Sequence, residues 1–195
     1  MLGVPLAFEK RVRLSIGVKQ DLQMWLEFLS KLNGVSALSN REWESNHMLE
    51  LFTDAAGGIG FGAYFQGQWI QDKWPPSVIA NPPSIAFLEF YPLVVAVKGW
   101  ATQLSGRKVR FHSDNMAVVH IINKQTSHCP KIMHLVRMFV LQCLKFNIAF
   151  KAVHVPGASN NIADSLSRFQ MTRFRAMAPQ AAPHMTPLPF LPHVW

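Results

Sequence analysis

The sequence predicts an α/β domain in three layers, with a five-stranded mixed sheet flanked by helices. Short segments rich in β-branched and aromatic residues alternate with longer segments of helical periodicity over residues 48–170. Gly and Pro residues separate these segments, and their order is β-β-β-α-β-α-α-β-α. Such alternation is typical of layered α/β domains. The chain of 195 residues has room for one such domain and two extensions, residues 1–47 and 171–195.

The first extension, residues 1–47, contains one predicted amphipathic helix over about residues 18–32. Its apolar residues recur at steps of three and four, and Asn33-Gly34 supplies a stop signal. They are Leu22, Trp25, Leu26, Leu29 and Leu32. One helix cannot bury such a stripe alone, so we expect it to pack on the next domain or on a separate partner.

The first half of the central domain predicts three strands. Residues 48–54 form the first, and the glycine-rich run 55–65 makes a tight turn into the second. Residues 68–74 form the third, which Pro75-Pro76 closes.

The second half begins with a predicted helix over about residues 86–104. Pro92 falls inside it, so the helix either begins late, with Pro92 in its first turn, or is kinked there. A strand over 108–112, helices over 117–123 and 130–146, and a strand over 148–155 follow. After Pro156-Gly157 a last helix covers about 161–168.

The second extension, residues 171–195, is predicted to be a disordered or extended tail. Five of its 25 residues are proline and no apolar period continues through it. A proline-rich ligand for a recognition domain is the less favoured alternative.

The bulk composition favours a globular, intracellular protein with a nucleic-acid partner. The net charge is +8 and the pI is about 9.9, and both favour phosphate binding, although a generically basic protein is the alternative. The two cysteines, Cys129 and Cys143, form no CxxC pair and indicate free thiols in a reducing compartment. We expect no membrane span and no secretion signal, and hence a cytoplasmic or nuclear location.

Acidic residues are scarce in the central domain. Residues 48–170 hold six Asp or Glu against eleven Lys or Arg. Four of the six stand among apolar or small residues, where an ionised carboxylate is costly unless it is paired or metal-bound. These four are Asp54, Glu89, Asp114 and Asp164.

The four acids are candidate ligands for divalent metal ions. Each falls at the end of a predicted strand or on a helix, and they are too far apart in sequence to form a local motif. Their hard oxygen donors select Mg²⁺, or Mn²⁺, over zinc. Two such ions can activate a water and stabilise a leaving oxygen in phosphodiester hydrolysis, so no Ser or Cys nucleophile is needed.

Four blocks of sequence resemble the RNase H domain of retroelement reverse transcriptases. In order, these are TDAAGGIGFGAYFQGQW, LEFYPLVVAVKGW, VRFHSDNMAVVHIIN and FKAVHVPGASNNIADSLSR, within about residues 48–168. The flanking segments DLQMWLEFLSKLNG and DSLSRFQMTRFRAMAP look like those of DIRS-type, tyrosine-recombinase retrotransposons. On this resemblance residues 1–47 are the end of a polymerase region, and that region is the expected partner.

The resemblance implies an RNase H-like fold and cleavage of the RNA strand of RNA–DNA hybrids with two Mg²⁺ ions, for which Mn²⁺ can substitute. Asp54 would bridge both ions, Glu89 and Asp114 would complete the shell of the first, and Asp164 would hold the second. Reading of 2′-hydroxyls across the minor groove would select RNA, with Asn115 as a candidate contact. The basic residues Arg107, Lys108 and Lys124 are candidate phosphate contacts, with an ordinary solvated face as the alternative.

One departure from the family concerns a mobile histidine that many cellular RNases H carry before the last acid. The loop from Pro156 to Ala163 is short, and Ala158 stands near the position of that histidine. We expect His154 to lie on the preceding strand and not to act as a general acid.

Simpler interpretations stay open for single residues. Asp114 or Asp164 alone could be a helix cap, and Trp69, Trp74 and Trp100 are expected in the core. Two other functions also stay open: a non-catalytic RNase H-like remnant that binds nucleic acid or supports a polymerase, and a related transposase or Holliday-junction nuclease.

Overall fold

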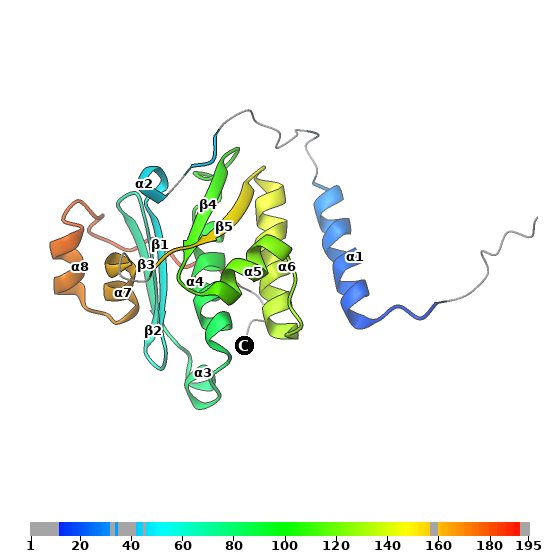
Figure 1. Ribbon diagram of the computed structural model, residues 1–195, viewed down its shortest axis with the longest axis horizontal. Helices are drawn as coiled ribbons and strands as arrows, with labels where there is room; N and C mark the ends of the chain where they lie inside the picture. Colours follow the sequence, from blue (N-terminus) through cyan, green and yellow to red (C-terminus); the bar gives the residue numbers. More distant parts are fainter. Residues whose placement is uncertain (1–11, 32–33, 35–41, 45, 157–159, 192–195) are drawn as a thin grey trace, which may run out of the picture.

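The computed structural model describes residues 12–31, 34, 42–44, 46–156 and 160–191. Ala158, and with it the expectation about the mobile histidine, lies outside these residues. The α/β class is confirmed, since helices and strands alternate along the central domain (Figure 1).

The first three strands form an antiparallel sheet in the order β1-β2-β3. They are β1 (Leu51–Ala56), β2 (Gly60–Phe65) and β3 (Gln68–Lys73). The turn between β1 and β2 uses Gly58 at φ 75°, a conformation that favours glycine. The register places Asp54 of β1 opposite Gly62 of β2.

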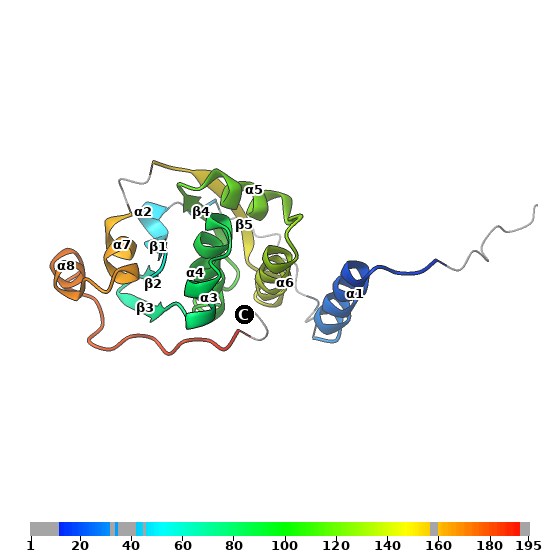
Figure 2. The same ribbon diagram turned by 90° about the horizontal axis from the view of Figure 1, so that it is seen from below.

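Helices cover both faces of this sheet. Helix α4 (Ile85–Gly99) packs on one face and α7 (Asn161–Ser167) on the other, and α8 (Met171–Met177) packs beyond α7 (Figure 2). Ser84 caps α4, so Pro92 lies well inside the helix and not in its first turn. Ten of the residues of α4 are buried because the helix lies between the sheet and α6. A short helix that the sequence did not predict, α3 (Pro76–Ala80), precedes it.

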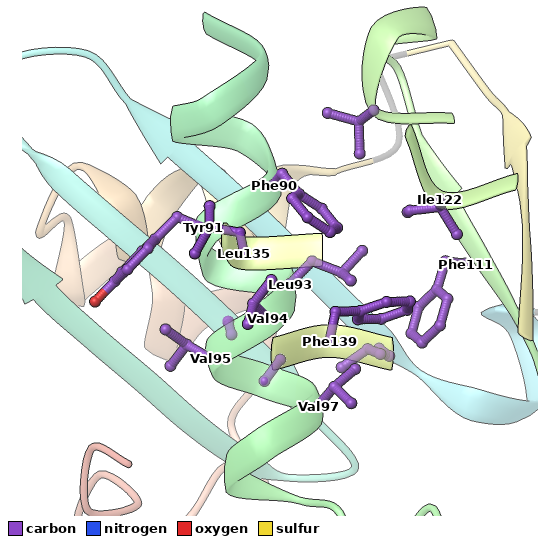
Figure 3. Packing of buried hydrophobic residues seen from close by; sticks show 14 of the residues in the cluster. Phe90, Tyr91, Leu93, Val94, Val95, Val97, Phe111, Ile122, Leu135 and Phe139 are labelled. Atoms are coloured by element: carbon purple, nitrogen blue, oxygen red, sulfur yellow. The ribbon is translucent and has the colours of Figure 1, made fainter. Parts of the chain in front are cut away.

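The other two strands form a parallel pair, β4 (Lys108–Ser113) and β5 (Ala149–His154). Helices α5 (Met116–Lys124) and α6 (Pro130–Lys145) connect them. The core between this unit and α4 is aromatic: the ring of Phe139 lies 5.7 Å from Phe90, 5.7 Å from Phe111 and 4.7 Å from Phe150 (Figure 3). These edge-on contacts fix how α6 lies against α4 and the strands.

The five strands do not form the single mixed sheet that the sequence predicted. Within the described residues β1 pairs only with β2, and β4 pairs with β5. Glu44 lies beside Val109 of β4: its nitrogen donates to the Lys108 carbonyl at 2.8 Å, and its carbonyl accepts from the Arg110 nitrogen at 3.0 Å. Helix α2 (Asn46–Leu49) then turns the chain away before β1 begins. Residues 48 and 49, predicted to start the first strand, are therefore helical.

Helix α1 (Ile16–Leu29) packs on α6 with its polar side. Arg137 of α6 contacts Asp21 at 2.7 Å, and Lys145 of α6 contacts Glu27. Within the predicted apolar stripe, Leu22, Trp25, Leu26 and Leu29 are 49–63% exposed, and Trp25 lines a cavity together with Met133 and Val140 of α6. The neighbouring domain therefore covers these residues only in part, and Leu32 lies outside the described residues.

Residues 171–191, predicted to be a disordered or extended tail, form helix α8 and then a segment without regular secondary structure. Helix α8 buries Phe174, and the chain then runs along the outer edge of β3. Ala182 and Thr186 donate backbone hydrogen bonds to Gly67 (2.7 Å) and Trp69 (2.8 Å). Prolines, which cannot donate, alternate here with residues that can, so the segment covers the strand edge without continuing the sheet.

Candidate metal centre

The four predicted metal ligands come from four different elements. Asp54 lies within β1, two residues before its end, and Glu89 lies on the second turn of α4. Asp114 directly follows β4, and Asp164 lies in the first turn of α7. Glu89 and Asp114 reach the cavity where the two sheets part, and Asp54 and Asp164 are not among the residues that line it.

A small cavity of about 40 Å³ lies at this parting. Glu89 and Asp114 line it, together with backbone and side-chain atoms of β1, β4 and the start of α7, among them Thr53, Ser113 and Asn160. A polar cavity of this size has room for one or two waters. Asn160 donates a hydrogen bond of 2.8 Å to the Thr53 carbonyl, which ties the start of α7 to β1.

The acids influence each other's protonation. Burial raises the pKa of Glu89 to about 8, and the charges of Asp54 and Asp114 add to the effect. Burial also raises the pKa of Asp54, against a hydrogen bond from Ser167, while the charges of Asp164 and Asp114 raise it further. Glu89 and Asp54 are therefore harder to ionise than free carboxyl groups, first because they are buried and then because other acids lie near them.

Asp54 is held by a buried hydroxyl. Ser167 of α7 is fully buried and donates a hydrogen bond of 2.5 Å to Asp54 Oδ2. The approach of α7 depends on Gly62: a Cβ there would lie 2.4 Å from Leu166 Cβ and 2.8 Å from the backbone nitrogen of Ser167. The glycine-rich run thus serves close packing of α7 on the sheet.

Asp164 is occupied by two arginines. Arg168 Nε lies 2.7 Å from Oδ1, and Arg173 Nη1 lies 2.6 Å from Oδ2. Burial opposes ionisation of Asp164, but the hydrogen bonds and charges of Arg168 and Arg173 outweigh it and hold its pKa below the usual range. The carboxylate is thus ionised and already paired.

Of the predicted nucleic-acid contacts, Asn115 directly follows Asp114, whereas Arg107, Lys108 and Lys124 lie apart from the acids. Asn115 is the N-cap of α5, where its side chain accepts from the Ala117 and Val118 nitrogens at 3.0 and 3.4 Å. Arg107 forms an ion pair of 3.2 Å with Glu44.

Lys108 and Lys124 are also set apart from the acids. Lys108 begins β4 while Asp114 follows its end, which separates them by roughly 17 Å of strand. Lys124 is exposed at the far end of α5, about 13 Å of helix from its start. The three Trp residues expected in the core, Trp69, Trp74 and Trp100, are buried.

Several residues at the centre were not predicted from the sequence. Ser167, Asn160 and Arg173 act through contacts between elements that are distant in the chain or through α8, so no local pattern indicated them. Arg168 lies four residues after Asp164, and this local spacing of opposite charges could have indicated it. His154 ends β5 as expected, is exposed, and places Nε2 3.1 Å from the Asp114 carbonyl. Ser167 could have been identified from its position on the same predicted helix as Asp164, three residues further along.

The donor chemistry fits a hard divalent cation. Asp54, Glu89 and Asp114 offer carboxylate oxygens, and a nearby cation would favour the ionised form of Glu89, whose pKa is raised by burial and further by the charges of Asp54 and Asp114. In the described part of the chain, however, no three acidic, His or Cys side chains stand close enough to ligate one ion together. The donors fit the metal while their present spacing does not complete its shell.

No helix in the part of the chain that the structure describes is long and apolar enough to cross a membrane. In comparisons with known proteins, no family model matches this chain and no curated protein is significantly similar to it.

Proposed function

We propose that residues 48–170 are a ribonuclease H domain that cleaves the RNA strand of RNA–DNA hybrids with two Mg²⁺ ions, in the context of a retroelement polymerase. The observation that carries the proposal is the electrostatic coupling of the four acids. Glu89 of α4 responds to the charges of Asp54 and Asp114, and Asp54 also responds to Asp164. Four elements thus contribute carboxylates to one region of a basic protein.

The side chains have separate tasks in this proposal. Asp54, Glu89, Asp114 and Asp164 would hold the ions, whose chemistry is to activate water and to stabilise the leaving oxygen. Ser167 fixes the orientation of Asp54 through its hydrogen bond. Glu89 must lose the proton that its raised pKa favours before it can act as a ligand.

One observation favours the alternative of a non-catalytic domain that binds nucleic acid. Both carboxylate oxygens of Asp164 are paired with arginines. Within the described residues no acid cluster has ligating spacing. A domain that used these acids only for structure would have the same arrangement.

Cleavage of a labelled RNA–DNA hybrid by the full chain, with Mg²⁺ or Mn²⁺, separates the candidates. We expect cleavage that ends in 3′-hydroxyl and 5′-phosphate groups and is abolished by Asp54→Asn. Asp72→Asn is the matched control, because Asp72 is an exposed acid at the end of β3. Cleavage that survives Asp54→Asn would refute the proposal. Hybrid binding without turnover would establish the non-catalytic alternative, and efficient cleavage of DNA-only substrates would indicate a transposase or junction nuclease.

A further inference from the structure

The arginine pair on Asp164 joins two helices. Arg168 belongs to the turn that ends α7, and Arg173 belongs to α8. Arg173 also bonds Gln170 Oε1 at 3.0 Å and Asn161 Oδ1 at 2.9 Å. Its guanidinium is therefore positioned by three side chains at once, and not by a single surface ion pair.

Arg168 also interacts with a second of the four acids, Asp54. Arg168 lowers the pKa of Asp54 by its charge, although burial and the neighbouring acids leave that pKa raised. The side chains of Arg168 and Arg173 are 46% and 41% exposed, and that of Asp164 is 29% exposed. A solvent-borne ion or phosphate can therefore reach all three.

A cation that used Asp164 would have to replace these two partners. Both carboxylate oxygens already accept charge-assisted hydrogen bonds, the stronger kind. Displacement of Arg168 and Arg173 from Asp164 would leave two guanidinium groups beside the cation without a carboxylate partner. A guanidinium group binds phosphate well, because the phosphate oxygens accept two parallel N–H bonds.

We propose that Arg168 and Arg173 act as an exchangeable internal cation: they neutralise Asp164 while no metal is bound, and they transfer to a phosphate of the nucleic acid when a divalent ion takes Asp164. This inference rests on the proposed function, since it assigns the ion and the polyanion to the same site. Metal and nucleic acid then bind cooperatively, because each removes a competitor of the other.

Calorimetric titration of the full chain with Mn²⁺ tests the first part of the proposal, that the arginines compete with the ion for Asp164. Arg168→Gln and Arg173→Gln should each bind the ion about two- to fivefold more tightly than the wild type, the range expected for loss of one partly exposed pair. Lys131→Gln, which removes an exposed positive charge from α6, should bind like the wild type. Unchanged or weaker Mn²⁺ binding in both arginine variants would overturn the inference.

Salt dependence of nucleic-acid binding tests the second half, with a 2′-O-methyl RNA–DNA hybrid that resists cleavage. With Mn²⁺ present, each arginine variant should lower the slope of log Kd against log salt by about 1, as for loss of one phosphate contact. With EDTA the slopes should equal that of the wild type. Equal slopes under both conditions would also overturn the inference.

Two further variants keep these outcomes separate from failure of folding or of the proposed function. Arg173→Lys keeps the charge and should bind Mn²⁺ with intermediate affinity, so it carries the test if Arg173→Gln melts at a much lower temperature. Asp54→Asn should weaken Mn²⁺ binding. If Asp54→Asn weakens Mn²⁺ binding but the arginine variants bind Mn²⁺ like the wild type, only the proposed transfer of the arginines is refuted. If Asp54→Asn leaves Mn²⁺ binding unchanged, the proposed function is refuted as well.

Discussion

Replacement of Glu89 by Gln should make the metal-free protein more stable at alkaline pH. The pKa of Glu89 is raised from 4.5 to about 8, so the folded state keeps a proton that the unfolded state releases. Between these pH values the folded state binds more protons, and the free energy of unfolding falls as pH rises. The stability linked to Glu89 is therefore complete below about pH 4.5 and lost as pH passes through 8.

The size of the effect follows from that interval. Between the two pKa values the free energy of unfolding falls by about 1.4 kcal/mol per pH unit, so its total loss has an upper limit of roughly 5 kcal/mol. Glu89 is partly exposed and lines a cavity with room for water, so we expect about 2–3 kcal/mol after screening. Glu89→Gln keeps the shape of the side chain and removes this dependence.

Urea unfolding in EDTA, followed by tryptophan fluorescence at pH 5, 7 and 9, measures the difference. The unfolding free energies of Glu89→Gln and the wild type should nearly agree at pH 5, and the variant should be more stable by about 2–3 kcal/mol at pH 9. Glu50→Gln, at an exposed position before β1, is the control and should show no such divergence. Parallel pH profiles for Glu89→Gln and the wild type would refute the reasoning.

Three other substitutions test the packing around the centre by the free energy of unfolding. Ser167→Ala should cost about 1.5–3 kcal/mol, because Asp54 loses a buried charge-assisted bond. The buried Ser165, whose hydroxyl donates to the Ile162 carbonyl, is its control, and an equal cost of Ser165→Ala would contradict the role of Ser167. Gly62→Ala should cost at least about 2 kcal/mol through the close contact with α7, whereas Gly57→Ala, with open space around it, should cost less than about 1 kcal/mol. Arg175→Ala should cost about 1–2 kcal/mol and expose residues 178–191 to proteolysis, because Arg175 donates hydrogen bonds to the carbonyls of Ala181, Ala182 and Pro183. Unchanged protease sensitivity would show that other contacts hold residues 178–191.

The strands and most helices of the central domain were predictable because their apolar periods are local. The predicted strand over 68–74 corresponds to β3, and the predicted helix over 130–146 corresponds to α6 within one residue. The separation of β1 from β4 was not predictable, since strand pairing depends on contacts between distant segments, and Glu44, which bridges β4, lies outside the predicted strands. The course of residues 171–191 was missed because its hydrogen bonds go to β3 and α4, far away in the sequence.

The sequence by itself determined the α/β class, the order of the elements and the four isolated acids of a basic chain. These properties depend on residue type and spacing, which a sequence displays directly. Only the tertiary structure decided that Ser167 holds Asp54, that two arginines occupy Asp164 and that the strands form two sheets. Each of these rests on contacts between distant segments, which come together only when the core of α4, α6 and the sheet is formed.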